Sequence, residues 1–513
     1  MALWRSTVIV SAMTMLSRVL GLVRDIVLLN VFGAGKDFDT FVVAFRIPNF
    51  FRRLFAEGAF SQAFIPVLTE YKTGRTHAEV QILISRVFGC LMTVMTALTF
   101  IAMVAAPAVL YIYAPGFHAD PEKFDLAVSM FRLTIPYLLF MSLTAFASSI
   151  LNSYGSFASP AFSPVLLNVA MIAGAWWLTP YMAEPIMALG WAVIAAGVLQ
   201  LAIQIPELWH KKLLIPPKVD FKHEGVDRIM KLMLPALFGV SVTQINLLLN
   251  TIWASFMQDG SVSWLYSAER MTELPLGLIG VAIGTVILPA LSTRHAEQDM
   301  SKFRGMMDWA AKVIVLVGVP ASIALFMLST PIIQALFQRG QFTLEDTQMT
   351  ALALQCMSAG VISFMLIKVF APGFYAQQDT KTPVRVGLMA VAANAILNVI
   401  FIGFFKLIDW QAEHMALALA SSGSAMVNAG MLYFYLHKRN IFRFAGHWKK
   451  LSLQFAIANA VMIAVLWYGL TWYNGEVSQW IRISEVLGLC VLGVLAYGLG
   501  LLATGFRPRH LKP

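Results

Sequence analysis

The chain has 513 residues, of which 58% are hydrophobic and 12% are charged, whereas soluble domains carry about 25% charged residues. This composition excludes a soluble multidomain enzyme, a disordered chain and a secreted disulfide scaffold, and it is typical of a protein that lies mostly in lipid. The net charge of +10 predicts basic cytoplasmic loops rather than nucleic-acid binding. Three cysteines in apolar runs, Cys90, Cys356 and Cys490, indicate no disulfide framework.

The N-terminal apolar run contains Arg18, Arg24 and Asp25. A secretory signal peptide would have an uninterrupted apolar core followed by a small-residue cleavage site. We therefore expect a retained first membrane helix.

Apolar segments near or above the roughly 20 residues that cross a bilayer recur along the whole chain. They predict an all-α polytopic membrane protein with about 14 transmembrane helices. We expect these helices at residues 7–32, 38–70, 79–113, 124–154, 160–181, 185–208, 226–256, 262–293, 302–336, 346–376, 382–406, 411–437, 448–473 and 480–506.

Loop charge predicts the orientation of these helices. With the N-terminus placed in the cytoplasm, the loops and helix ends predicted to lie inside carry 22 Lys and Arg residues, and those predicted to lie outside carry 5. Basic residues accumulate on the cytoplasmic side of membrane proteins, so this ratio supports the helix count. Both termini are then expected to be cytoplasmic.

Two pairs of segments indicate an internal repeat with a spacing of six helices. Residues 63–69 (AFIPVLT) resemble residues 286–292 (VILPALS), and Leu-Asn pairs at 167–168 and 397–398 each lie within a predicted helix that Ser-Pro or Thr-Pro precedes. Parallel repeats with a site between the halves are a transporter architecture. We expect two pseudo-symmetric six-helix lobes plus two C-terminal helices: an N-lobe at 1–210, a cytoplasmic linker at 211–223, a C-lobe at 224–440, and the last two helices with a cytoplasmic tail at 441–513.

Ionisable residues inside the predicted helices are the most informative feature of the sequence. An arginine at the bilayer centre costs about 2.5–3.5 kcal/mol, so such residues must face a water-filled cavity, pair with acids or reach an interface. They are Arg18, Arg24 and Asp25 in the first helix, Asp39, Arg46, Arg52, Arg53 and Glu57 in the second, Glu269, Arg270 and Glu273 in the eighth, and Lys368 in the tenth.

Pairing with nearby acids would explain some of these charges. Arg53 with Glu57, and Arg270 with Glu273, have the spacing that brings side chains together on one helix face. For Arg46 we expect a structural pair with Asp39.

Glycine and proline are expected to interrupt two of the charged helices. Gly21 lies within the first, and Pro48 and Gly58 lie within the second. Broken helices at membrane depth are tolerated where they line a cavity.

A functional interpretation is favoured for Arg18, Arg24, Arg52 and Arg270. These residues come from both predicted lobes, and a site between the lobes would collect them. The guanidinium fork suits bidentate recognition of phosphate, so we expect a cationic cavity for a phosphate or diphosphate. The chain has no phosphate loop, no metal-ligand spacing and no Gly-x-Ser-x-Gly elbow, which favours a transporter over an enzyme.

Several motifs resemble one membrane protein family. The first is residues 15–25 (MLSRVLGLVRD), and the longest is residues 45–66 (FRIPNFFRRLFAEGAFSQAFIP). Further matches are residues 260–264 (GSVSW), the Glu-Arg pair at 269–270, residues 371–375 (APGFY) and residues 379–383 (DTKTP). On these motifs the chain resembles the MurJ (MviN) family of lipid II flippases in the MOP exporter superfamily.

The resemblance implies a V-shaped two-lobe fold and alternating access. The implied substrate is lipid II, the undecaprenyl-diphosphate-linked peptidoglycan precursor, moved from the inner to the outer leaflet of the bacterial cytoplasmic membrane. The family's roles carry over to substrate-binding Arg18, Arg24, Arg52, Arg53 and Arg270, to an outer-gate acid at Asp39, and to the gating or supporting residues Asp25, Glu57, Glu273 and Lys368. The last two helices are implied to form a groove for the lipid tail.

One departure from the family concerns a sodium site that uses a carboxylate in the seventh helix. Residues 237–246 carry no acid here, although Asp379 is present, so we assign no metal ligand and no cofactor. Coupling to the membrane potential or to a monovalent cation stays open.

Two other kinds of transporter compete with this interpretation. They are an exporter of another polyprenyl-linked glycan, which would share the diphosphate, and a drug or cation antiporter, which the intramembrane arginines disfavour. The expected partners are lipid II, membrane lipids and cell-wall synthesis proteins, with no nucleic acid, and a monomer is expected to suffice.

Overall fold

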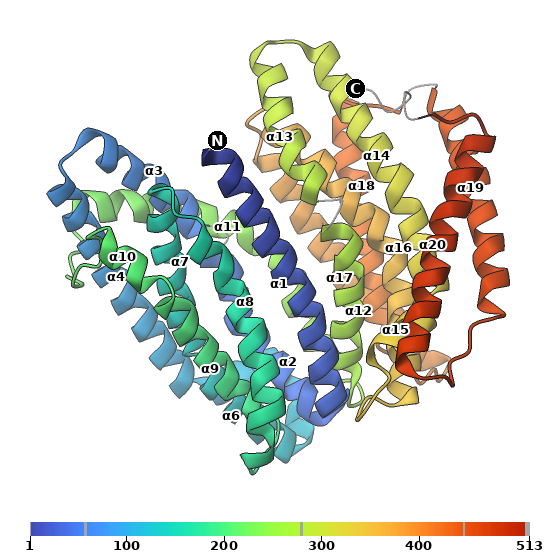
Figure 1. The fold of residues 1–513 in the computed structure, drawn as a ribbon, viewed down its shortest axis with the longest axis horizontal. Helices are drawn as coiled ribbons and strands as arrows, with labels where there is room; N and C mark the ends of the chain where they lie inside the picture. The colour runs from blue at the N-terminus through green and yellow to red at the C-terminus, as the bar shows by residue number, and fades with distance from the viewer. Residues whose placement is uncertain (1, 56–58, 278–280, 445–446, 508–513) are drawn as a thin grey trace. The chain divides into compact units, whose positions relative to one another are not determined.

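The computed structural model describes residues 2–55, 59–277, 281–444 and 447–507. Within these ranges, statements about side chains leave out residues 2–9, 53–55, 59, 234–244, 281–282, 285 and 447. All regular elements among the described residues are helices (Figure 1), in agreement with the all-α prediction.

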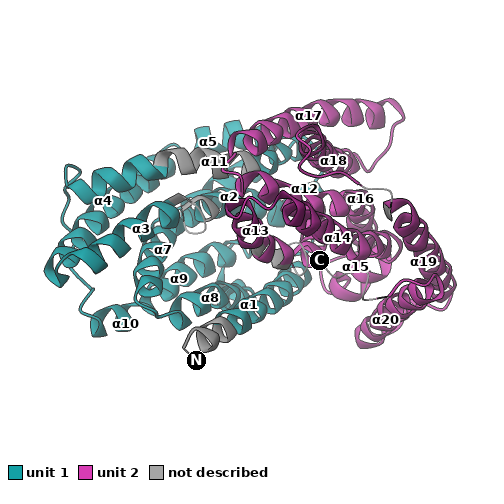
Figure 2. Cartoon of the chain, turned by 90° about the horizontal axis from the view of Figure 1, so that it is seen from above, with its two compact units in different colours: residues 1–263 teal, residues 264–513 magenta. Residues whose placement is uncertain are grey.

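The chain divides into two compact units, residues 1–263 and 264–513, which Figure 2 colours separately. Unit 1 contains α1 (Ala2–Phe32), α2 (Lys36–Phe55), α3 (Ala59–Gly74), α4 (His77–Val104), α5 (Ala106–Tyr113), η1 (Pro115–Ala119), α6 (Pro121–Thr134), α7 (Tyr137–Ser153), α8 (Ala158–Ala173), η2 (Gly174–Leu178), η3 (Thr179–Tyr181), α9 (Met187–Ala202), α10 (Ile205–His210) and α11 (Glu224–Ala254).

The next helix, α12 (Ser261–Pro275), begins with the last residues of unit 1 and continues into unit 2. The rest of unit 2 consists of α13 (Val281–Ala296), α14 (Met300–Met327), α15 (Ser329–Phe337), α16 (Leu344–Tyr375), α17 (Lys381–Leu407), α18 (Met415–Lys438), α19 (His447–Leu470) and α20 (Gln479–Ala503).

Ten helices among the described residues are long and apolar enough to span a membrane. They correspond to ten of the fourteen predicted segments. The other four segments are α1, α2 with α3, α11, and α12 with α13. Three of these carry the intramembrane charges that we selected from the sequence, and part of α11 lies outside the residues whose side chains are described. The chain is therefore a multi-pass membrane protein, and the count of fourteen spans stays a prediction.

Neither of the two predicted breaks that fall on described residues occurs. Pro48 lies inside α2, which continues from Lys36 to Phe55, so the predicted break at this proline is wrong. The predicted helix 262–293 corresponds to α12 and α13, and residues 278–280 between them lie outside the described residues. The predicted break at Gly21 is also wrong, because α1 runs through it without interruption. Instead, Gly21 lies beside Asn168, whose side chain would be 3.8 Å from an added Cβ atom. Gly58 lies outside the described residues.

The compact units divide at a different position from the predicted lobes. The lobe boundary was expected at residues 211–223, whereas the chain divides into its two units between Ser263 and Trp264. The difference is α11, which packs against α3, so its contacts assign it to unit 1 although it follows the linker. The lobes as membrane segments stay a prediction.

Aromatic and aliphatic side chains form the interior of each unit. Phe64 and Phe88 both pack against Phe146 in unit 1. In unit 2, Phe370 contacts Phe442 within a buried cluster drawn mainly from α13, α14, α16 and α18. Burial of these side chains holds each bundle together and gives its polar residues defined positions.

Candidate functional site

Arg24 is buried and held by neighbouring side chains. It is 4% exposed, and its Nε and Nη2 atoms donate to Asp25 Oδ1 at 2.9 and 2.6 Å. Its Nη1 atom donates to Asn168 Oδ1 at 3.0 Å. Arg18, two turns earlier on α1, is exposed. Among the described side chains of α1, Arg24 is therefore held by its neighbours and Arg18 is accessible.

Asn168 was not among the predicted site residues. It is buried on α8, which packs against α1, and its Nδ2 atom donates to the Ser17 carbonyl at 3.0 Å. One signal in the sequence pointed to it, because Asn168 belongs to the repeated Leu-Asn pair. Its contact with Arg24 spans 144 positions and comes only from the packing of α8 on α1.

Two arginines of α2, Arg46 and Arg52, have short contacts with polar side chains. Arg46 Nη1 donates to Thr251 Oγ1 at 2.6 Å, and Arg52 Nε donates to Asn49 Oδ1 at 2.8 Å. The expected pair between Arg46 and Asp39 is wrong. Two helical turns place these residues about 10 Å apart along the axis, and Asp39 has other partners. The predicted pair of Arg53 and Glu57 lies outside the described side chains.

Arg270 lies on α12 between two side chains of the same helix. Its Nη1 atom pairs with Glu273 Oε2 at 3.1 Å, as the spacing predicted. Its Nε and Nη2 atoms donate to the Tyr266 hydroxyl at 3.3 and 3.2 Å, a contact that we did not predict. The Arg270 side chain remains 31% exposed, so both neighbours orient a guanidinium that is still accessible.

Lys368 on α16 differs from the arginines. Its side chain is exposed, and it makes no ion pair with any side chain that the structure describes. Its backbone lies close to Gly284, where an added Cβ would be 3.5 Å from the Lys368 carbonyl oxygen.

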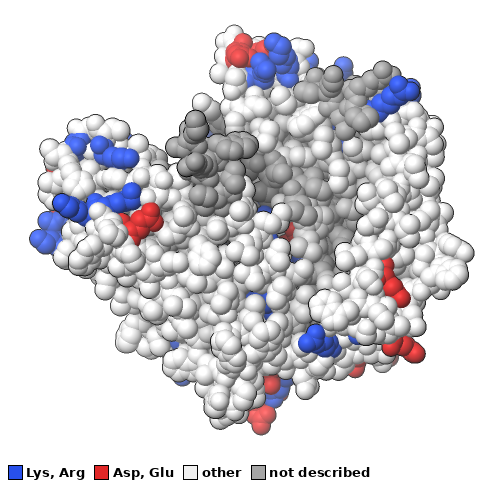
Figure 3. Space-filling model, viewed as in Figure 1, with Lys and Arg blue, Asp and Glu red and all other residues white. Residues whose placement is uncertain are grey.

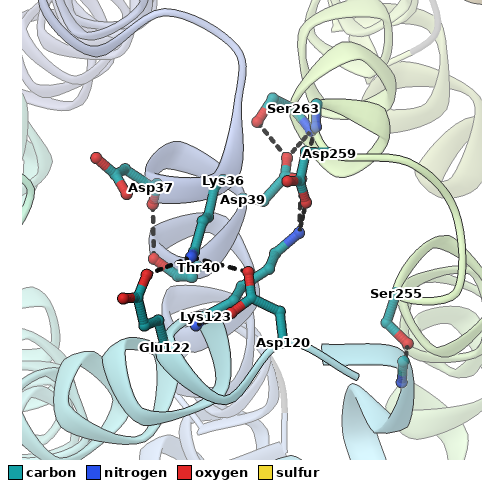
Figure 4. Close-up of polar contacts among 12 residues, drawn as sticks. Lys36, Asp37, Asp39, Thr40, Asp120, Glu122, Lys123, Ser255, Asp259 and Ser263 are labelled. Atoms are coloured by element: carbon teal, nitrogen blue, oxygen red, sulfur yellow. Dashed lines mark hydrogen bonds and ion pairs between the residues drawn. The ribbon is translucent and has the colours of Figure 1, made fainter. Parts of the chain in front are cut away.

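Asp39 is the centre of a buried polar cluster (Figure 4). Its side chain is 1% exposed and accepts hydrogen bonds from the Gly260 N–H at 2.8 Å, and from the Ser263 N–H at 2.9 Å and hydroxyl. A carboxylate at this position caps the N-terminus of α12, where backbone N–H groups are unpaired. Gly260 has φ of +92°, a backbone conformation that favours glycine.

Lys123 supplies the positive charge of this cluster. Its Nζ atom lies 3.4 Å from Asp39 Oδ2 and 2.5 Å from Asp259 Oδ1, and its side chain is 5% exposed. The start of α6 fixes this lysine, because Asp120 caps the helix through the Lys123 N–H. Nothing in the sequence linked Lys123 to Asp39.

Asp379 is already engaged by neighbouring side chains. It accepts from the Thr382 N–H at 3.0 Å and hydroxyl at 2.6 Å, and pairs with Arg439 Nη1 at 2.6 Å. Burial favours the neutral form, but the hydrogen bonds outweigh it and lower the pKa of Asp379 to about 2. Among the described residues, no group of three or more His, Cys, Asp or Glu side chains could hold a metal ion.

The chemistry of these groups suits an anion. Arg18 and Arg270 present accessible guanidinium groups, and Arg24 is desolvated and held in one orientation. The structure brings Arg24 together with Asp25 in unit 1, and Arg270 together with Glu273 in unit 2. Such charge-assisted contacts are strong in a low-dielectric setting.

The fold of the chain is shared with a known membrane transporter. The chain is similar to an inward-facing multidrug resistance MATE family transporter of the MOP superfamily, with a TM-score of 0.67 over 84% of this chain and 97% of that one. Sequence identity in this comparison is 13%, so the similarity concerns the fold alone.

More specific comparisons identify the family. The family model described as lipid II flippase MurJ matches residues 28–490. Probable lipid II flippases MurJ from Vibrio cholerae and Haemophilus influenzae are each 44% identical, over 99% and 97% of this chain and 98% and 99% of theirs. A solved lipid II flippase MurJ in an inward closed conformation has a TM-score of 0.79 at 26% identity, covering 96% of this chain and 98% of that one. The chain belongs to the MurJ family of lipid II flippases.

Proposed function

We propose that this protein moves lipid II from the inner to the outer leaflet of the cytoplasmic membrane by alternating access. The observation that carries the proposal is the family match over residues 28–490. The arginines on α1, α2 and α12 supply a physical reason, because the diphosphate of lipid II needs cationic partners inside an apolar protein.

In this proposal, Arg52 and Arg53 attract the headgroup, and Arg18, Arg24 and Arg270 bind the diphosphate. Arg18 and Arg270 are exposed enough to take a ligand directly. Arg24 can take one only by exchanging its contacts with Asp25 and Asn168. Tyr266 and Glu273 orient Arg270 for bidentate binding.

The cluster around Asp39 acts as an outer latch in this mechanism. Asp39 bonds to Gly260 and Ser263, which are the residues at the start of α12, and Arg270 lies two turns further along that helix. Opening toward the outside breaks these bonds, so binding of the diphosphate must favour the open state by more than the latch favours the closed one. Lys123 remains available to either Asp39 or Asp259.

The experiment is transbilayer movement of labelled lipid II in proteoliposomes. We expect Arg270→Ala to lose transport and Arg132→Ala to retain it, because Arg132 is an exposed residue of α6 that donates to the Met103 carbonyl. Arg270→Lys tests the geometry, since an ammonium keeps the charge but not the bidentate fork. Folding of each variant is checked by monodispersity in detergent.

Normal transport by Arg270→Ala would reject the diphosphate site. Competition with unlabelled lipids separates the candidate substrates, because an exporter of another polyprenyl-linked glycan would be inhibited best by that glycan lipid. Applying or omitting a membrane potential tests voltage coupling, which is worth about 2.3 kcal/mol per charge per 100 mV. A dependence on sodium or another monovalent cation would instead favour ion coupling.

A further inference from the structure

The segment that joins α10 to α11 lies against α4 in a defined way. The Lys218 N–H donates to the Ser85 carbonyl at 3.0 Å, and the Ser85 hydroxyl donates to the Pro216 carbonyl at 2.7 Å. Gln81 Nε2 donates to the Lys212 carbonyl at 2.8 Å. These three bonds hold residues 212–218 against successive turns of α4.

Gly89 shows how closely the segment approaches the helix. A Cβ atom added to Gly89 would lie 2.4 Å from the backbone carbon and oxygen of Lys218, so only glycine allows this crossing. Leu213 within the segment is buried, and Asp220 pairs with Arg86 of α4 at 3.7 Å. The segment is therefore packed onto unit 1 rather than extended away from it.

The sequence of α4 indicates the depth of this crossing. Its first turns carry His77, Glu79, Gln81 and Arg86, whereas residues 87–104 contain no charged side chain. These 18 residues span about 27 Å, close to the thickness of the hydrocarbon core. The contacts at residues 81–89 therefore place the segment where the apolar part of α4 begins, which is the level of the lipid headgroups.

The outward side of the segment combines apolar and basic residues. Trp209 is 71% exposed and Phe221 is 48% exposed, and Leu214 and Val219 are exposed between them. The basic residues are Lys211, Lys212, Lys218 and Lys222, and none of them pairs with an acid among the described residues. Figure 3 shows basic side chains gathered over the end of unit 1 that holds the start of α4 and α10.

Two of the acids in this region are paired with arginines. Asp220 is paired with Arg86, and Glu224 with Arg75. Glu207 accepts a hydrogen bond from the Ser159 hydroxyl, which carries no charge. The four lysines outnumber this one acid, so they leave a net positive charge beside exposed aromatic and aliphatic groups, the combination that binds the interface of an anionic membrane.

We propose that residues 209–222, here called the linker surface, are a docking surface for anionic phospholipid headgroups. The lysines bind the phosphates, and Trp209, Leu214, Val219 and Phe221 enter the boundary between headgroups and acyl chains. A lipid surface fits better than an acidic protein, because the bonds to α4 hold the segment at headgroup depth. Each lysine near an anionic surface favours the docked state by about fivefold.

The test places a fluorophore at Phe221→Cys in the full chain, with Cys90, Cys356 and Cys490 replaced. The protein is studied in nanodiscs of phosphatidylcholine alone or mixed with phosphatidylglycerol. We expect phosphatidylglycerol to protect the probe from acrylamide in water and to expose it to a lipid-borne nitroxide quencher. Replacing all four lysines with glutamine should lower the ratio of docked to undocked probe by about tenfold or more.

A matched control replaces the exposed Lys449 and Lys450 at the start of α19, which should leave the probe unchanged. Raised salt should weaken docking, because it screens exposed charges. Three outcomes would overturn the proposal: a probe that stays open to acrylamide in phosphatidylglycerol, equal protection in both lipids, or protection that survives in the four-lysine variant. The readout does not depend on transport, so it stands apart from the flippase assay.

Discussion

Asp39 is buried at a helix N-terminus, and Lys123 is the residue that compensates its charge. The pair lies 3.4 Å apart with both side chains at most 5% exposed. Removing one partner of a buried ion pair leaves an uncompensated charge, which costs far more than losing an exposed pair. The same structure contains an exposed counterpart for comparison, because Lys36 pairs with Asp120 and Glu122.

Lys123→Met is expected to destabilise the protein by up to about 3 kcal/mol, since Asp39 keeps its other hydrogen bonds. Lys36→Met should cost less than about 1 kcal/mol. Both losses of stability are measured by unfolding the purified variants in detergent, with intrinsic fluorescence as the signal. Equal losses of unfolding free energy in the two variants would show that Lys123 has no special role beside Asp39.

Asp379 provides a residue whose effect depends on pH. Its pKa of about 2 lies below that of an unfolded aspartate, so the ionised form stabilises the native state. This contribution is complete above the unfolded pKa of about 3.9 and is lost as pH falls toward about 2.

The gap in unfolding temperature between the wild type and Asp379→Asn should therefore narrow as the pH falls below about 4. Arg439→Met should reduce the same gap, because Arg439 is one of the two partners of Asp379. A gap that stays constant across this pH range would mean that Asp379 does not stabilise the native state as an anion.

At the scale of elements, the helices of unit 2 depend on close approaches at small residues. Gly360 of α16 faces Ser422 of α18, and an added Cβ would be 2.8 Å from the Ser422 Cα atom. The Ser422 hydroxyl donates to the Cys356 carbonyl at 2.8 Å, so the two helices are also bonded at this crossing. Small residues allow membrane helices to pack in this way.

Gly360→Ala is expected to destabilise unit 2 by about 1–3 kcal/mol, because the α16–α18 crossing would have to widen. Gly403 of α17 is the matched control, since nothing lies within 4 Å of its added Cβ. Gly403→Ala should be neutral or stabilise by up to about 1 kcal/mol through helix propensity. Thermal unfolding in detergent compares the two, and a stable Gly360→Ala variant would contradict the close crossing.

The elements also show why some helix predictions needed correction. The sequence indicated the apolar segments but suggested a break at Pro48 that does not occur, because α2 continues through it. It also suggested a break at Gly21 that does not occur, because Gly21 lies beside Asn168 and α1 continues through it. Such positions depend on what the neighbouring helix presents, and a single sequence does not contain that information.

At the scale of the whole molecule, the positive-inside pattern predicts which loops face the periplasm. Single cysteines at the exposed positions Glu122 and Glu476 should react in intact cells with a membrane-impermeant thiol reagent. Cysteines at Glu297 and Asn440 should react only after the membrane is opened. The native Cys90, Cys356 and Cys490 are replaced first. Labelling of Asn440→Cys in intact cells would contradict the predicted fourteen-helix topology.

The sequence by itself determined that the protein is helical and lies in a membrane, because the length and composition of apolar runs are local properties. It also selected the charged residues of α1, α2 and α12, because a charge in an apolar run is visible without any partner. The motifs in these helices were specific enough to indicate the family that the comparisons identified.

The spacing within α12 predicted the pair of Arg270 and Glu273, but only the tertiary structure decided which distant residues hydrogen-bond to the charged side chains. Ser263 lies 224 positions from Asp39, Thr251 lies 205 from Arg46, and Asn168 lies 144 from Arg24. Buried polar groups take whichever partner the packing of distant helices brings within hydrogen-bond distance. That packing depends on the interlocking of side chains along whole helices, so it cannot be derived from the spacing of residues within one of them.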